Sequence, residues 1–425
     1  MKRKLIMLFN IYKNDIKKSV RILIRFLFLT VSSIIIGIVT GFAGTAFKLS
    51  IHFVTGIRSE NPLLVLCLPL AGVITYLLYR VCRQERSTGT NLVLESVRTE
   101  EKISVFTAPL MFVCTVISHL CGASVGCEGA ALQIGGGISQ CAANALKMDQ
   151  KDIHVMTMCG MSGCFAALFG TPIAAAVFAI EVISVGVMYY SSLVPCVVSS
   201  LTAHYIAHSF GVNAEIIKAP ICDNYDVLLL LKVALLAIGC AVVSILFCKA
   251  LRLFSHIASV MKNPIVRSLV MSAVACGLIF LFGADDYAGA GTTVINRALG
   301  GSAQPFAFLI KMLLTAICVN AGLKGGEIIP SFFIGAAFGA VIGPLIGMDA
   351  GFAAAIGLLG VFCGVTNCPV ATLVIAVELF GASNTVYYMT AIAISYFCSG
   401  YYGLYSTQKI VYSKYLPEFI NIKAK

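Results

Sequence analysis

Two carboxyl groups inside apolar stretches are the residues of this sequence best suited to chemistry. Glu128 stands within Gly126–Gly129, and Glu327 follows Gly325–Gly326 in a matching context. A carboxylate at such a position is costly and indicates function. A helix that begins at either segment would direct its positive end and free N–H groups inward, which suits an anion. The Glu128 carboxylate is then predicted to occupy the place of a bound anion and to leave it on protonation.

Each acid also has a structural interpretation. Glu128 could cap its own helix, as carboxylates at helix starts often do. Glu327 could cap its helix or pair with Lys324, and we favour a structural role because a carboxylate facing an anion repels it. The N–H groups of Ile328 and Ile329 would remain free, and Pro330 fits a first helical turn.

Hydroxyl groups supply further candidates. Thr88 lies in the polar segment 87–91, where its hydroxyl could donate to an anion or, like that of Thr90, cap a helix. Tyr405 lies near the end of the last apolar segment, and its phenol could bind an anion or belong to an interfacial aromatic belt. Glu181 and Glu378 end matching apolar segments and are interpreted as interfacial or helix-packing carboxylates.

These positions belong to a near-repeat of the sequence. Gly89 and Gly291 are 202 residues apart, Glu128 and Glu327 are 199 apart, and Glu181 and Glu378 are 197 apart. The near-constant offset predicts two copies of one module. Repeated membrane modules place small-ligand sites between the copies, near the bilayer midplane, where broken helices meet.

Composition fixes the class of protein. Of 425 residues, 59% are hydrophobic and 12% are charged, against about a quarter charged in soluble proteins. Runs such as 26–47, 63–79 and 227–248 are long enough to span a bilayer, and about ten or more such segments are expected. The sequence therefore predicts an all-α polytopic membrane protein. Its apolar runs are too long for membrane strands and do not alternate between apolar and polar residues.

Charge and cysteine content narrow the partners. The net charge of +11 includes eight Lys or Arg among the first 25 residues, which is typical of a cytoplasmic arm at an anionic lipid surface and not of nucleic-acid binding. The 17 Cys lie mostly in apolar segments, and no ligand spacing suggests a metal or another cofactor. We predict an arm over 1–25, repeats over 28–210 and 227–410, a connector over 211–226 and a tail over 411–425.

Four motifs in order resemble the CLC family of chloride channels and anion/proton antiporters. Gly126–Gly129 resembles its gating-glutamate motif, Gly325–Pro330 its second anion-binding helix start, and Gly403–Ser406 the site of its central tyrosine. Ser87–Asn91 falls at its first motif, with Thr88 at the serine position.

The resemblance implies a fold with two inverted-topology repeats. It implies that Glu128 is the gate and proton acceptor, and that the following residues surround the anion: Thr88, Gly126, Cys127, Gly129, Gly326, Ile328, Ile329 and Tyr405. It further implies a homodimer in the cell membrane with both termini cytoplasmic, and a transporter in place of an enzyme.

Departures from the chloride members point to one branch of the family. Ala130 replaces the proline after the gate motif, Thr90-Asn91 replaces Ile-Pro, and Ile328 replaces an aromatic residue. The inner proton-relay glutamate of the chloride antiporters aligns with Val182. These changes resemble the fluoride-exporting branch, so proton-coupled fluoride export is expected before chloride transport.

Alternative functions stay open at this point. One is a chloride channel or a chloride/proton antiporter of the same fold. Another is an intramembrane serine protease, because Gly160-Met161-Ser162-Gly163 matches the sequence pattern around a nucleophilic serine. Its candidate bases are His119, His154 and His204. A cation channel is disfavoured, because the membrane-depth acids do not form rings.

Overall fold

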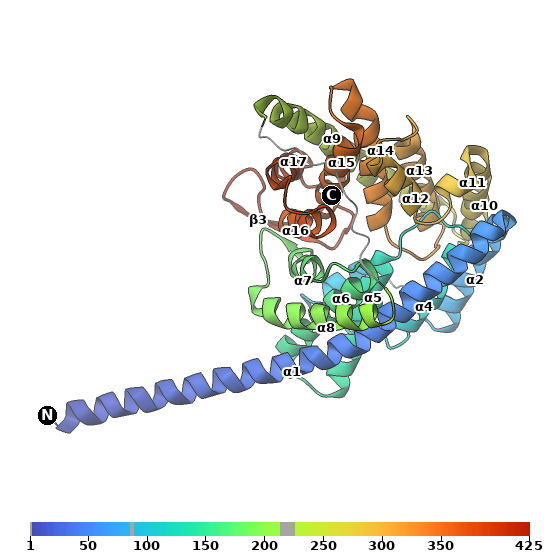
Figure 1. The fold of residues 1–425 in the computed structure, drawn as a ribbon. Coiled ribbons are helices and arrows are strands. Elements are labelled where there is room, and N and C mark those ends of the chain that lie inside the picture. Colours follow the sequence, from blue (N-terminus) through green and yellow to red (C-terminus); the bar gives the residue numbers. More distant parts are fainter. Residues whose placement is uncertain (1, 86–88, 213–225) are drawn as a thin grey trace.

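A computed structural model describes residues 2–85, 89–212 and 226–425, with side chains from Asp15 onward except that of Asp285. The first element, α1 (Lys2–Glu60), is one helix of 59 residues, about 88 Å long. It runs along one side of the molecule and projects beyond it at the N-terminus (Figure 1). The basic arm predicted over residues 1–25 is therefore continuous with the first apolar helix, since no proline or glycine interrupts the sequence between them.

The other helices follow in two series. The first series contains α2 (Leu68–Val81), α3 (Thr90–Ser96), α4 (Thr107–Leu120), α5 (Glu128–Ala145), α6 (Gln150–Phe169), α7 (Pro172–Glu181) and α8 (Leu193–Ser209). The second series contains α9 (Val227–Val260), α10 (Pro264–Phe282), α11 (Ala284–Tyr287), α12 (Thr292–Leu299), α13 (Ala307–Asn320), α14 (Ile328–Leu345), α15 (Ala350–Thr366), α16 (Pro369–Phe380) and α17 (Thr385–Cys398). Two 3-10 turns, Pro62–Cys67 and Tyr190–Ser192, precede α2 and α8.

The central helices of the two series match in order and length, which confirms the repeat. Helices α4 and α13 have 14 residues each, and α5 and α14 have 18 residues each. The α5–α6 pair corresponds to the α14–α15 pair, and α7 packs against its counterpart α16. The first series fills the lower part of Figure 1 and the second fills the upper part. The chain is a polytopic all-α protein with inverted repeats, as the sequence predicts.

Fewer helices are full-length spans than expected. Among the described residues, six helices are long and apolar enough to cross a bilayer, and another six apolar helices have 10–17 residues. The expectation of about ten or more full-length spans is therefore wrong. The short helices are halves of interrupted segments, because Gly- and Pro-containing turns divide apolar runs that hydropathy alone would join.

Glycine permits the close approach of the central helices in both repeats. A Cβ on Gly135 of α5 would lie 2.0 Å from the carbonyl oxygen of Gly160 in α6. A Cβ on Gly335 of α14 would lie 2.3 Å from the corresponding oxygen of Gly357 in α15. The small residues thus bring the two helix backbones into contact and fix the positions of the helices that begin at the site.

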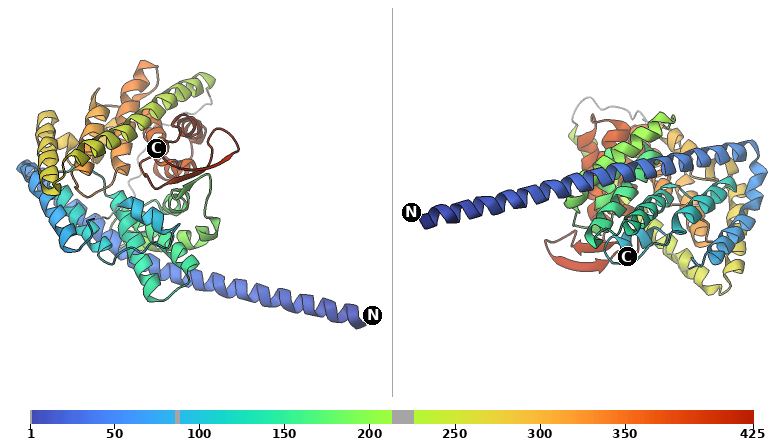
Figure 2. Two further views of the ribbon diagram at one scale, coloured as in Figure 1. Left: turned by 180° about the vertical axis from the view of Figure 1, so that it is seen from behind. Right: turned by 90° about the horizontal axis from the view of Figure 1, so that it is seen from below.

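A small sheet was not anticipated from the sequence. Strand β1 (Ser184–Val185) pairs in parallel with β2 (Lys409–Tyr412), which pairs antiparallel with β3 (Phe419–Lys423). The last residues of the chain therefore attach to the first repeat. The β2–β3 hairpin lies toward the N-terminal half of α1, whereas α10 and α11 lie toward its C-terminal end (Figure 2). The sequence of the tail over 411–425 does not predict strands, because the three strands of the sheet are short and far apart in the chain.

Candidate functional site

The starts of α5 and α14 meet at the centre of the molecule. The backbone N–H of Gly126 donates to the carbonyl oxygen of Gly326, and the N–H of Gly326 donates to that of Gly126, both at 2.7 Å. This antiparallel bridge joins the residues two positions before the first residue of α5 and of α14, so Glu327 corresponds in the structure to Cys127 and not to Glu128. Both helices therefore begin at one point, with the free N–H groups of their first turns beside each other. Such a pair of helix starts suits a negatively charged group.

Close approach, not backbone conformation, is what requires glycine here. Neither Gly126 nor Gly326 is among the residues with positive φ. A Cβ on Gly326 would lie 2.5 Å from the backbone nitrogen of Gly129. The turn is formed with ordinary backbone angles, and a side chain would separate the two helix starts.

Glu128 is the first residue of α5 and is 2% exposed. Its Oε1 accepts a hydrogen bond from the Cys127 thiol at 3.2 Å, and its Oε2 has no partner among the described residues. No side-chain hydrogen bond caps α5 at its N-cap residue. The carboxyl group lines a cavity together with Cys127 and Ile329. It is therefore positioned to enter or leave the helix-start region.

Glu327 makes neither of the contacts predicted for it. It is the N-cap residue of α14, but its side chain caps nothing. The Lys324 ammonium lies 4.2 Å from the centroid of the Tyr79 ring, and the ion pairs among the described residues do not include it. Glu327 instead interacts electrostatically with Tyr405. The preferred structural interpretation of Glu327 is thus without support.

Tyr405 lies in the interior, not in an interfacial belt. The residue is 2% exposed, and its hydroxyl has no hydrogen-bond partner among the described residues. Its side chain interacts electrostatically with both Glu327 and Glu128, from the two repeats. A buried, unpartnered hydroxyl beside two helix starts can donate to an anion.

The remaining predicted donor cannot be placed, because Thr88 lies outside the described residues. Its neighbour Gly89 is the N-cap of α3, and Thr90 begins that helix. The Thr90 hydroxyl contacts the carbonyl oxygen of Gly129 at 3.4 Å, so α3 does reach the start of α5.

Sequence reasoning missed Gln133 and Lys311. The Gln133 amide donates to Thr90 Oγ1 and to the carbonyl oxygen of Gly129, both at 3.1 Å, which ties α3 to α5. Lys311 is fully buried in α13, and its ammonium donates to the carbonyl oxygen of Gly289 at 2.6 Å. Both are polar residues inside apolar runs. That signal was available in the sequence and was applied only to acids.

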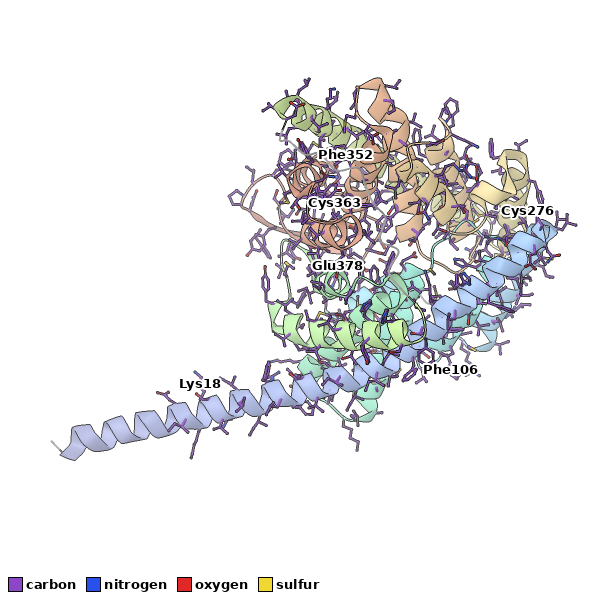
Figure 3. All side chains as sticks on the ribbon, in the orientation of Figure 1. Lys18, Phe106, Cys276, Phe352, Cys363 and Glu378 are labelled. Atoms are coloured by element: carbon purple, nitrogen blue, oxygen red, sulfur yellow. The ribbon has the colours of Figure 1, made fainter. Side chains whose placement is uncertain are left out.

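Glu181 and Glu378 form a reciprocal pair of helix caps. The Glu181 carboxylate, at the end of α7, accepts from the N–H groups of Val370 and Ala371 at 3.1 and 2.7 Å. The Glu378 carboxylate, in α16, accepts from the N–H groups of Ile173 and Ala174 at 3.1 and 2.8 Å. Figure 3 shows Glu378 between α16 and α7. The helix-packing interpretation of both acids is therefore confirmed.

The protease arrangement is not assembled. The Ser162 hydroxyl, inside α6, donates to the carbonyl oxygens of Cys159 and Cys196 at 2.9 and 3.1 Å. His119 Nδ1 contacts the carbonyl oxygen of Thr115, and His154 Nε2 contacts that of Thr99. The third candidate base, His204, stacks on His208. The part of the chain that the structure describes also holds no group of His, Cys, Asp or Glu suited to a metal.

A cavity of about 260 Å³ adjoins Glu128 on the side toward the C-terminal end of α1. Its polar lining residues are Lys48, His52, Thr55, Arg58, His119, Thr292, Thr293 and Asn296. The cavity brings the end of α1 together with residues 288–296, and of its basic residues the sequence singled out only His119, as a candidate base of a protease.

The fold and the site define a polytopic membrane protein whose inverted repeats join two broken helices around a buried carboxyl group. Residues 70–400 match the family described as "voltage gated chloride channel", and the chain belongs to this family. It is 33% identical over 404 residues to the chloride/fluoride channel protein of Pseudomonas syringae pv. tomato, covering 91% of this chain and 88% of that one. It is 21% identical to the H(+)/Cl(-) exchange transporter ClcA of Vibrio campbellii, covering 85% and 83%.

Solved structures agree with this assignment. A CLC-type fluoride/proton antiporter superposes with a TM-score of 0.87 at 29% identity, covering 90% of this chain and 98% of that one. A slow cyanobacterial Cl-/H+ antiporter superposes with a TM-score of 0.76 at 16% identity, covering 87% and 94%, and this likeness concerns the fold alone.

Proposed function

We propose that this protein moves a halide across the cell membrane in exchange for protons, with Glu128 as gate and proton acceptor. The observation that carries the proposal is the meeting of two helix starts beside one carboxyl oxygen without a partner. The helix starts attract an anion, and the ionised carboxylate competes with it for the same N–H groups. A proton neutralises Glu128 and releases that place to the halide, so proton and halide movements are coupled.

The following residues would surround the halide: Thr88, Gly126, Cys127, Gly129, Gly326, Ile328, Ile329 and Tyr405. The helix starts supply backbone N–H groups, and Tyr405 supplies a hydroxyl that has no other partner among the described residues. No cofactor is needed for this role, and the protein acts as a transporter, not as an enzyme.

Fluoride is the favoured substrate, and chloride is the alternative. The favoured choice is supported by the similarity to a chloride/fluoride channel protein and to a CLC-type fluoride/proton antiporter. It is also supported by Val182, which is fully buried where a second, inner carboxyl group would be expected in chloride antiporters. In this structure the amide of Gln408 donates to the Val182 carbonyl oxygen at 2.8 Å.

The proposed assembly is a homodimer with both termini in the cytoplasm. The excess of Lys and Arg in the first 25 residues supports a cytoplasmic N-terminus. The C-terminal hairpin lies toward the same end of α1, which supports a cytoplasmic C-terminus (Figure 2). The cavity beside Glu128 would then open to the outside.

Ion fluxes from proteoliposomes test the proposal. Vesicles loaded with fluoride or chloride should release the halide while external pH is recorded, and a fluoride gradient should drive protons in the opposite direction. Glu128→Gln should abolish the proton movement, because the amide cannot take up and release a proton. The matched control Glu60→Gln alters an exposed carboxylate and should behave as wild type.

Three outcomes would count against parts of the proposal. Coupled exchange in Glu128→Gln would refute the role of that residue. Chloride release without fluoride preference would overturn the choice of anion and leave the family unchanged. Absence of halide movement in the wild type would refute the function.

A further inference from the structure

We propose that the cavity beside Glu128 is a second anion site, which holds one hydrated halide on the outer side of the helix starts. This inference rests on the proposed function, because it concerns the ion that the site at Gly126 and Gly326 would release. The site is formed by the C-terminal part of α1 and by residues 288–296, and none of these belongs to the motifs that carry the family resemblance.

Basic groups gather around this cavity. Lys48, Arg58 and His119 line it directly. Lys311 stands behind its wall, where its ammonium bonds the carbonyl oxygen of Gly289 at 2.6 Å. His119 interacts electrostatically with Arg58, Lys311 and Lys48. A concave wall of one sign of charge concentrates ions of the opposite sign.

The cluster has little acidic compensation within the described residues. The three ion pairs found there lie elsewhere and involve neither Lys48 nor Arg58 nor Lys311. Glu128 is the acidic residue among those that line the cavity, and it interacts electrostatically with Lys48. When Glu128 accepts a proton, even this compensation is lost. Uncompensated positive charge inside a membrane protein is costly, so the arrangement favours a bound anion.

His119 indicates that the anion keeps part of its water. The residue is 1% exposed, and its Nε2 has no hydrogen-bond partner among the described residues. Its Nδ1 contacts the carbonyl oxygen of Thr115 at 2.9 Å and must donate, because a carbonyl oxygen can only accept. The neutral ring therefore presents Nε2 as an acceptor. An acceptor repels a bare anion but binds the hydrogen of a water molecule.

The size and polar lining of the cavity fit such an occupant. A volume of about 260 Å³ holds a halide together with several waters. Thr292, Thr293 and Asn296 of α12 add hydroxyl and amide groups to the lining. Lys48 neutralises the charge of the halide, and these hydroxyl and amide groups take the place of individual water molecules in its hydration shell. A halide that has passed Glu128 would then regain its hydration shell in steps.

Bromide in crystals tests the location of the site. Anomalous diffraction from wild-type crystals grown in sodium bromide should show a peak between Lys48 and His119, apart from any peak at Gly126 and Gly326. Bromide confined to the helix starts would overturn the proposal.

Calorimetric titration with sodium fluoride tests the chemistry. In detergent-solubilised protein, Lys48→Gln should weaken one of two binding phases by about tenfold, the low end of the effect of focused charge. Lys48 is half-buried, so the variant is expected to fold, and gel filtration checks this. The matched control Lys249→Gln removes the same charge from an exposed position of α9 and should leave both phases unchanged.

The remaining outcomes separate this inference from the proposed function. Lost proton coupling in Lys48→Gln with unchanged fluoride binding would show that Lys48 is only the counter-ion of Glu128, and would overturn the anion site. Normal wild-type exchange with a single binding phase would also overturn it and leave the function intact. Absence of wild-type exchange would refute the function itself.

Discussion

A buried oxygen without a hydrogen-bond partner costs stability, and this site keeps two of them close together. Glu128 Oε2 and the Tyr405 hydroxyl both lack a partner among the described residues. Each comes from a different repeat, and both are almost fully buried. Such groups are usually satisfied in a folded protein. Their persistence here is explained when a transported ion, and not the protein, completes their bonding.

Tyr405→Phe should separate stability from binding. The substitution removes a hydroxyl that no described group uses, so the melting temperature should be unchanged or slightly raised. The affinity for halide should fall, because one donor to the anion is lost. Thermal unfolding in detergent and calorimetric titration with halide measure the two effects. A large loss of stability would show that the hydroxyl has a structural partner, and unchanged affinity would exclude it from the site.

At the scale of single residues, the sequence predicted those site residues that stand in a recognisable local motif. Glu128 was found because glycines surround an acid inside an apolar run, and Tyr405 because of a motif. Lys48 and Arg58 could not be assigned from the sequence, because they lie in an ordinary apolar helix and face the site only through the packing of α1. Gln133 was recognisable in principle as a buried amide in a helix and was overlooked.

Each repeat contributes one acid that caps a helix of the other repeat, and these contacts join the elements around the site. Glu181 caps the start of α16, and Glu378 caps the start of α7. Each cap satisfies two backbone N–H groups that a helix start otherwise leaves free. The offset of 197 residues revealed that these acids correspond. It could not reveal that each bonds the other's helix, because sequence spacing carries no information on how two repeats face each other.

Glu181→Ala should destabilise the protein by about 1–3 kcal/mol, because the substitution leaves two backbone N–H groups without their charged acceptor. Glu378→Ala should cost less, since Glu378 is half-buried whereas Glu181 is 6% exposed. Denaturation in detergent compares both variants with Glu60→Ala, an exposed acid whose loss should have little effect. Equal and negligible effects at both positions would contradict a stabilising role for the caps.

The two glycines of the central bridge should respond differently to alanine. A Cβ on Gly326 would meet the backbone of Gly129 at 2.5 Å, so Gly326→Ala should lower the yield of folded protein sharply. A Cβ on Gly126 first meets Glu128 Oε2 at 2.3 Å, a movable group, so Gly126→Ala should fold but displace the gate and alter proton coupling.

Expression, thermal stability and proteoliposome flux measure these effects. Gly56→Ala is the control, because nothing lies near its added methyl group, and the gain in helix propensity should stabilise it by about 1 kcal/mol. Normal folding of Gly326→Ala would mean that the two helix starts can separate without loss.

Viewed as a whole molecule, the chain should survive being cut between its repeats. A protease site inserted within residues 213–225 would divide the chain between α8 and α9. The central bridge, the reciprocal caps and the β1–β2 pairing all connect the halves without passing through that segment. After cleavage, the two fragments should therefore elute together in gel filtration and retain halide exchange. Fragments that separate in mild detergent would show that chain continuity is needed to hold the repeats together.

The central bridge also limits how this protein can move. Two backbone hydrogen bonds of 2.7 Å fasten one half to the other at the point where the ion must pass. A mechanism in which the halves swing about a hinge would break both bonds in every cycle. Under the proposed function, the moving part can instead be as small as the carboxyl group of Glu128, and the surrounding helices can keep their positions while the ion passes.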